Sequence, residues 1–295
     1  MLLAGGANLA IAVAKLVAGL LSGSSGMLAE GAHSVADTLN QVFLLTALKR
    51  SKKPADSRHP FGYGMERYFW SLLAAVGIFV LGAGFSFYEG IHSLIQPQPV
   101  EALPLAFGVL ALSFVFEGSS WLKAVLQLRR EAREQEKSAV RHLVDTPDPT
   151  VKTVAFEDTA ALIGLVLAAA GLGLHALTGS SAWDAVASIA IGCLLIVVAV
   201  SLGMQSKANL IGQSLPEQAR DEVRRTIDGS PGVDRTLELL TMRLGPEDVL
   251  VAAKVDVIDH KSGGDLEQLA DEVDRRVREA HPEVRHVFLD PTPGG

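Results

Sequence analysis

The sequence predicts an α-helical membrane protein in which six transmembrane helices precede a small α+β domain. Hydrophobic residues make up 48% of the 295 positions, and the mean hydropathy is positive, which argues against a wholly soluble chain. Residues 207–295 carry 12 basic and 18 acidic side chains, a net charge of −6, whereas residues 1–206 carry 14 and 15, a net charge of −1. We therefore place a transmembrane domain at 1–206 and a soluble domain at 207–295.

Six apolar runs are long enough to cross the roughly 30 Å hydrocarbon core of a bilayer as α-helices of about 20 residues. They lie at residues 3–22, 27–48, 69–94, 103–127, 149–176 and 182–205. A cleaved signal peptide is an alternative for the first run, but no basic segment precedes it and five further runs follow.

The loops between these runs predict the orientation. Residues 49–58 and 129–142 carry five basic side chains each, whereas the alternate loops 23–26, 95–102 and 177–181 carry none. The positive-inside rule places the basic loops, both termini and hence the soluble domain in the cytoplasm. We expect an integral, multi-pass protein, with a bacterial inner membrane as its location and an organelle membrane as the alternative.

Composition excludes several other classes of protein. The one cysteine, Cys193, is incompatible with a disulfide scaffold, a CxxC redox pair or a zinc ribbon. The net charge of −7 argues against a nucleic-acid partner. The sequence shows no glycine-rich nucleotide loop, so we expect no nucleotide partner and no ATP-driven pumping.

The candidate functional residues are ionisable side chains inside the apolar runs. Each costs roughly 2.5–3.5 kcal/mol on insertion scales, so such groups face a helix interior or water. His33 and Asp37 are four residues apart, which on a helix puts both on one face, about 6 Å apart. An imidazole and a carboxylate so placed can chelate a divalent transition metal. The alternative is a hydrogen bond that serves only helix packing.

Depth in the membrane favours a site shared with the fifth run. Asp37 lies roughly 15 Å from the outer end of its run, and Asp158 roughly 14 Å from the cytoplasmic end of its own. Two helices that enter from opposite sides therefore bring these carboxylates to one level. Glu157 points about 100° away from Asp158, so we expect only one of them to face the site squarely and the other to pair with Lys15 or Lys152.

Two further carboxylates have open roles. Glu117, in the fourth run, is a candidate proton relay or else packs against Ser119 or Ser120. Asp184, at the start of the sixth run, is expected to be solvated or to cap that run.

The last third of the chain predicts the order αββαβ. Residues 216–229 read as a helix with a proline near its start, and residues 264–280 read as an amphipathic helix. Residues 235–244, 248–258 and 284–289 have the alternation and turn signals of strands.

Several segments resemble the cation diffusion facilitator family of divalent-metal/proton antiporters. They are HSVAD in the second run, HPFGYGMER at residues 59–67 and WDAVASIAIG at the start of the sixth run. The stretch DPTVKTVAFEDTAALIG, with its Glu-Asp pair, is similar to a branch that includes mitochondrial zinc-exporter-like proteins. The resemblance implies a ferredoxin-like fold for the cytoplasmic domain and assembly as a homodimer.

The resemblance also implies a transport site with two ligands from the second run and two from the fifth. His33 and Asp37 match the first pair, and Asp158 matches the last ligand. Val154 stands where the family usually has a histidine, so Glu157 is the expected substitute. Three carboxylates and one imidazole suit Zn²⁺, and also Mn²⁺, Fe²⁺ or Co²⁺.

Some relatives bind further metal outside the membrane. In the loop before the third run, Asp56 and His59 are candidate ligands, although Tyr63 replaces a frequent histidine and the segment also reads as a structural turn. In the tail, the candidates show no tight ligand spacing; they are His260, His281, His286 and Asp290.

The function that we expect is efflux of a divalent cation, Zn²⁺ before the others, by metal/proton antiport with alternating access. Metal ligation needs neutral imidazole and ionised carboxylates, so protons compete for the same groups. The alternative is a membrane metal sensor or scaffold that binds metal there without flux. We expect no enzymatic activity, because Ser34 lies about 100° from His33 around the helix and is a poor nucleophile for it. The expected partners are the lipid bilayer, the transported cation, protons and a second copy of the chain; no cofactor is expected.

Overall fold

The computed structural model describes residues 2–97, 99–134, 138, 149–258 and 263–292. The chain divides into two compact units, the first formed by Met1–Leu48 and Phe69–Ser206 and the second by Lys49–Tyr68 and Lys207–Gly295.

Residues 49–68 belong to the second unit, whereas the sequence analysis placed them with the membrane helices. The ring of Phe61 meets that of His286 edge-on, with centroids 5.2 Å apart. A Cβ added to Gly64 would lie 3.1 Å from the Cα of Gly245, so these two backbones are in close contact. These contacts join positions 225 and 181 residues apart in the chain, which local sequence patterns do not reveal.

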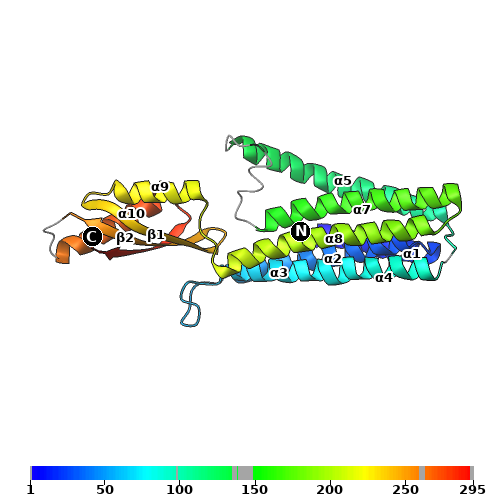
Figure 1. Ribbon diagram of the computed structural model, residues 1–295, viewed down its shortest axis with the longest axis horizontal. Helices are drawn as coiled ribbons and strands as arrows, with labels where there is room; N and C mark the ends of the chain where they lie inside the picture. Colours follow the sequence, from blue (N-terminus) through cyan, green and yellow to red (C-terminus); the bar gives the residue numbers. More distant parts are fainter. Residues whose placement is uncertain (1, 98, 135–137, 139–148, 259–262, 293–295) are drawn as a thin grey trace. The chain divides into compact units, whose positions relative to one another are not determined.

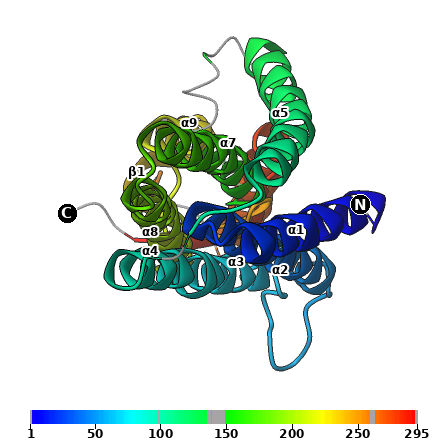
Figure 2. The same cartoon turned by 90° about the vertical axis from the view of Figure 1, so that its right-hand side faces the viewer.

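The first unit is helical throughout its described secondary structure (Figure 1). Its elements are α1 (Leu2–Ser22), α2 (Ser25–Ser51), α3 (Glu66–Gly77), η1 (Ile78–Gly84), α4 (Phe85–Ile95), α5 (Leu103–Glu134), α7 (Pro149–Thr178) and α8 (Ala182–Ile211). The segments α3, η1 and α4 follow one another without a break, so they form one long helix with a π-helical turn at its middle. In the end-on view, α5 lies beside both α7 and α1 (Figure 2).

Four helical segments of the described chain are long and apolar enough to cross a membrane. They are Glu66–Ile95, Leu103–Arg133, Phe156–Thr178 and Ala182–Ile211, and they correspond to the third to sixth predicted spans. In α1 the described apolar stretch, Asn8–Ser22, is shorter. The composition of α2 is more polar, because it carries the candidate site residues. The full count of six spans therefore stays a prediction.

Helices of the first unit approach closely where glycines stand at their crossings. A Cβ added to Gly90 in α4 would lie 2.6 Å from the side chain of Ile189 in α8. At Gly164 in α7, an added Cβ would collide with the carboxylate of Glu30 in α2. Gly173, also in α7, has nothing within 4 Å of the same position. Alanine substitutions at these two glycines of α7 therefore distinguish the effect of close packing, at Gly164, from the effect of helix propensity, at Gly173.

We expect Gly164→Ala to lower the thermal stability of the purified protein. The methyl group fits only if the Glu30 carboxylate moves, and overpacking of this kind costs about 1–3 kcal/mol. Gly173→Ala is the matched control, and we expect it to be neutral or slightly stabilising, since alanine has the higher helix propensity. Thermal unfolding followed by circular dichroism checks both variants; equal destabilisation of the two would contradict the close packing at Gly164.

The second unit has the predicted order αββαβ. Its elements are α9 (Glu217–Asp228), β1 (Val233–Gly245), β2 (Asp248–Val257), α10 (Gly263–Ala280) and β3 (Val284–Pro291). The sheet order is β1-β2-β3, with β1 antiparallel and β3 parallel to β2. A parallel neighbour requires a crossover connection, and α10 supplies it.

Alternation along β2 builds the core of this unit. Val249, Val251, Ala253 and Val255 are buried on one face of the strand. They belong to the same apolar cluster as the buried residues of the two helices, which are Val223, Ile227, Leu269, Val273 and Val277. Burial of these apolar side chains therefore explains why α9 and α10 both pack against the sheet.

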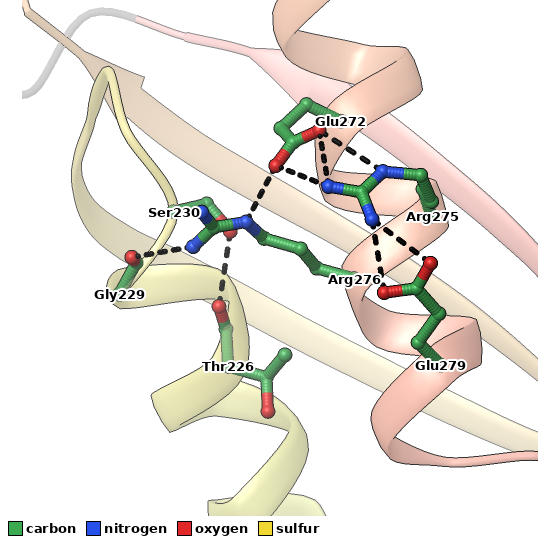
Figure 3. Close-up of polar contacts among 7 residues, drawn as sticks. All are labelled: Thr226, Gly229, Ser230, Glu272, Arg275, Arg276 and Glu279. Carbon is green, nitrogen blue, oxygen red and sulfur yellow. Dashed lines mark hydrogen bonds and ion pairs between the residues drawn. The ribbon is translucent and has the colours of Figure 1, made fainter.

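Polar contacts also join the end of α9 to α10 (Figure 3). The Arg276 guanidinium donates to the carbonyl oxygen of Gly229 at 3.1 Å and to the carboxylate of Glu272 at 2.6 Å. Arg275 pairs with Glu272 and Glu279. Exposed ion pairs of this kind are screened by water and salt, so the core, rather than this network, supplies most of the stability of the unit.

Candidate functional site

A cavity of about 280 Å³ lies among α1, α2, α5 and α7 of the first unit. Its described lining includes four carboxylates and no basic side chain. The lining residues are Asn8, Ile11, Ser34, Asp37, Gln41, Leu44, Phe116, Glu117, Ser120, Glu157, Asp158 and Ala161. Such a concentration of carboxylates at membrane depth is energetically costly, and groups of this kind typically mark a cation or proton pathway.

Helix α2 places Asp37 on the wall of this cavity, one turn after His33. The Nδ1 atom of His33 lies 3.4 Å from Oδ1 of Asp37, with a geometry that makes no hydrogen bond. Both ring nitrogens of His33 and this oxygen of Asp37 are buried without a hydrogen-bond partner. Buried polar atoms are nearly always paired, so Oδ1 of Asp37 and one ring nitrogen of His33 are suited to a cation, while the other nitrogen carries the proton of the neutral imidazole. His33 contacts Asp37 but does not itself line the cavity.

Helix α7 supplies Glu157 and Asp158, and both line the cavity. Glu157 accepts a hydrogen bond from the side-chain amide of Asn40, and its carboxyl group is close enough to that of Asp37 to interact with it. The expectation that only one of the adjacent pair faces the site is wrong. Side chains that point about 100° apart around a helix can both line one cavity when the cavity lies between their two directions.

Lys15 pairs with neither of these carboxylates. Its Nζ atom lies 3.0 Å from Oε2 of Glu30 and 2.7 Å from Oε1 of Glu117. The expected pairing with Lys15 is therefore wrong, and the side chains of Lys152 and Val154 lie outside the described residues.

The predicted ligands are neighbours but do not form a closed coordination shell. Among the described residues, no three His, Cys, Asp or Glu side chains are gathered closely enough to hold one metal ion. Asp37, Glu157 and Asp158 share the cavity wall, and His33 touches only Asp37 among them. The assignment of these four residues as ligands stays a prediction, and it requires α2 and α7 to draw together around the cation.

Two side chains of this region were not among the predicted ligands. Asn40 lies three residues after Asp37, on the same face of the helix, which is the signal that could have identified it. Glu117 lines the cavity and pairs with Lys15, whereas Ser119 donates to the carbonyl of Phe116 at 2.8 Å. Ser120, the other expected packing partner, lines the same cavity as Glu117, and the roles of Glu117 as proton relay or packing residue stay predictions.

Asp184 lies at the start of α8, but its side chain accepts hydrogen bonds from the N-terminus of α2. Its carboxylate accepts hydrogen bonds from the hydroxyls of Ser24 at 2.8 Å and Ser25 at 3.0 Å, and from the backbone N–H of Gly26 at 3.4 Å. The residue is 2% exposed, so the expectation of a solvated side chain, or of a cap on its own helix, is wrong. A carboxylate at a helix N-terminus satisfies free N–H groups and the helix dipole, and here it anchors the helix that carries His33 and Asp37.

In the loop before α3, the carboxylate of Asp56 is already engaged. Oδ1 accepts from the backbone N–H groups of Arg58 and His59 at 2.9 and 2.8 Å, and Oδ2 accepts from the hydroxyl of Tyr63 at 2.7 Å. The His59 ring lies against that of Tyr63 at a tilt of 37°, with centroids 4.2 Å apart. This geometry favours the structural turn over a metal site at Asp56 and His59.

The hydrogen bond from Tyr63 holds the pKa of Asp56 below its usual range and raises that of the phenol. We therefore expect Tyr63→Phe to raise the pKa of Asp56 toward the ordinary value of about 4. Because the folded-state pKa is the lower one, the contact stabilises the loop above the unfolded-state pKa and is lost as pH falls through the folded-state pKa. An NMR titration of the Asp56 carboxyl carbon measures this, with Tyr88→Phe as the control; an unchanged pKa would argue against the hydrogen bond.

The candidate ligands of the tail are not brought together. Nε2 of His286 lies 3.9 Å from Oδ1 of Asp248, and burial raises the pKa of that carboxyl group. Asp290 follows four residues later on β3, roughly 13 Å along the strand, beside Lys254 in the register. His281 lies 3.4 Å from the hydroxyl of Thr226, and His260 lies outside the described residues. His286 and Asp290 therefore cannot share one ion within this unit.

Comparison with known proteins explains the two units. Residues 1–211 match the model of the cation efflux transmembrane domain, and residues 215–293 match that of the cation efflux protein cytoplasmic domain. The chain belongs to the cation efflux (cation diffusion facilitator) family. It is accordingly a multi-pass integral membrane protein, and the resemblance drawn from the motifs of the sequence is confirmed.

The relatives include eukaryotic and bacterial transporters. The chain is 34% identical over 313 residues to the proton-coupled zinc antiporter SLC30A9, mitochondrial, of Xenopus laevis, covering 94% of this chain and 56% of the relative. It is 35% identical to metal tolerance protein C4 of Arabidopsis thaliana, covering 80% and 51%. It is 26% identical to the cation-efflux pump FieF of Klebsiella pneumoniae, covering 80% and 73%. The chain thus spans little more than half the length of the first two relatives, and the likeness to them confirms the mitochondrial zinc-exporter-like branch.

Proposed function

We propose that this cation efflux protein exports a divalent cation, Zn²⁺ in preference to Mn²⁺, Fe²⁺ or Co²⁺, in exchange for protons. The observation that carries the proposal is the cavity between α2 and α7. Three predicted ligands line it, and Glu157 and Asp158 each keep one buried oxygen without a hydrogen-bond partner. The names of the relatives, a proton-coupled zinc antiporter among them, support the same ion and the same exchange.

Each ligand has a defined part in this mechanism. Asp37, Glu157 and Asp158 supply the negative charge that replaces the hydration shell of the cation, and His33 supplies a nitrogen donor that favours transition metals over Mg²⁺ or Ca²⁺. Protons compete for the same atoms, because ligation needs ionised carboxylates and neutral imidazole. Rocking of the helices then exposes the loaded site to one side of the membrane and the protonated site to the other.

The basic loops support an orientation with both termini on the cytoplasmic side. We place the protein in a bacterial inner membrane, with an organelle membrane, which the name of the mitochondrial relative favours, as the alternative. Assembly as a homodimer is supported by the match of the second unit to the family's cytoplasmic domain. In that unit Leu240 and Phe288 are 59% and 54% exposed, so the sheet offers apolar side chains to a second copy.

The test is metal flux through the full-length protein in proteoliposomes with an imposed pH gradient. We expect entry of Zn²⁺, detected by a trapped indicator, that stops when an ionophore collapses the gradient. Mn²⁺, Fe²⁺ and Co²⁺ are run in parallel and are expected to move more slowly. Zn²⁺ binding without flux would reject antiport and favour the alternative of a membrane metal sensor or scaffold.

A further inference from the structure

Lys15 in α1 is fully buried, and its ammonium group has three acceptors. It donates to Oε2 of Glu30 at 3.0 Å, to the hydroxyl of Ser34 at 3.0 Å and to Oε1 of Glu117 at 2.7 Å. An ammonium group has three N–H donors, so all of them are used. Lys15 and Glu30 have no exposed side-chain surface, whereas Glu117 keeps 18%. The network therefore has a buried end at Glu30 and an open end at Glu117.

The open end of this network is a wall of the transport cavity. Glu117 and Ser34 both line the cavity with Asp37, Glu157 and Asp158. One oxygen of Glu117 is bound to Lys15, and the other, Oε2, is buried without a hydrogen-bond partner. Glu117 is thus shared between a fixed internal cation and the space that a transported cation enters.

We propose that Lys15 is a tethered counter-ion of the transport cavity, which holds Glu117 until a divalent cation arrives and then releases it. Glu117 thereby becomes an additional acidic contact from α5, and Lys15 sets how tightly the cation is held. This inference rests on the proposed transport function of the same cavity.

The contacts of Lys15 make the exchange feasible. When Glu117 turns to the cation, the ammonium group keeps Glu30 and Ser34, so its charge stays compensated on the buried side. A lysine suits this part because its ammonium is a point charge on a flexible four-carbon stem. A divalent ion carries twice the charge of the ammonium group and attracts Glu117 more strongly at equal distance. The alternative is a purely structural role, in which Lys15 only joins α1, α2 and α5. Changes at Lys15 or Glu117 would then leave the affinity for the cation unchanged, so affinity distinguishes the two roles.

The test is equilibrium binding of Zn²⁺ to the purified full-length protein at fixed pH. We expect Glu117→Gln to weaken binding about tenfold, because a charge-assisted contact is lost. The double variant Lys15→Met/Glu30→Gln removes both charges of the buried pair and leaves Glu117 to the cation, so we expect binding about tenfold tighter. Lys123→Met, on an exposed position of α5, is the matched control and is expected to bind like the wild type.

The outcomes separate this inference from the proposed function. Affinities of both variants within twofold of the wild type would overturn the role of Lys15, as would the absence of Zn²⁺ binding by the wild type. If the double variant fails to fold, the Zn²⁺ affinity of Glu117→Gln is the remaining test. This variant keeps the ion pair between Lys15 and Glu30, and an affinity equal to that of the wild type would overturn the inference. Wild-type binding without proteoliposome flux would reject antiport but leave the affinities to decide the role of Lys15.

Discussion

Asp37→Asn is expected to abolish proton-driven Zn²⁺ flux. Asp37 lines the cavity, contacts His33 and interacts with Glu157, so it is the residue through which the ligands of α2 and α7 meet. Asparagine keeps the size of the side chain but removes the charge and one anionic donor. Loss of an outer partner of a ligand already costs roughly 10–100-fold in metal affinity or activity, so loss of a ligand should cost about a hundredfold or more.

The measurement for Asp37→Asn is the initial rate of Zn²⁺ entry in proteoliposomes at equal protein content. Asp221→Asn, the same exchange at an exposed position of α9, is the control and should transport like the wild type. Flux within threefold of the wild type in Asp37→Asn would place the transport site elsewhere.

Asp184→Ala is expected to destabilise the helical unit by about 3 kcal/mol or more. The substitution removes the acceptor of two serine hydroxyls and one backbone N–H at the start of α2, and hydrogen bonds to charged groups contribute about 1.5–3 kcal/mol each. The donors that remain are buried, so water does not readily replace the lost acceptor. Asp184→Asn, which keeps the shape and one oxygen, should lose less.

Thermal and chemical unfolding of the purified protein measure this effect. Asp221→Ala, at the exposed position on α9, is the control and should unfold within about 0.5 kcal/mol of the wild type. Stability of Asp184→Ala equal to that of the control would mean that the carboxylate does not anchor α2.

Part of the candidate site could be predicted from the sequence, because the positions of residues within one helix depend only on their spacing. A spacing of four residues on one helix puts His33 beside Asp37 whatever the helix packs against, and ionisable residues within an apolar run are conspicuous. The same logic identified Glu157 and Asp158, but it could not give their rotation toward the cavity. That rotation depends on how α7 lies beside α2, and the glycine at position 164 permits this close approach to Glu30.

In both units, local sequence predicts the elements, whereas tertiary packing decides the contacts between them. Periodicity and composition within short windows predict the apolar helices and the order αββαβ, because burial of one face of a helix or strand is encoded in neighbouring residues. Three contacts join positions more than 100 residues apart: that of Lys15 with Glu117, the anchoring of α2 by Asp184, and the packing of residues 49–68 with the rest of the second unit. Such contacts depend on the relative rotation and register of packed elements, and no local pattern specifies these. The spacing of His33 and Asp37 therefore predicts a metal site from the sequence alone, whereas the contacts that surround the cavity come from the packing of the helices.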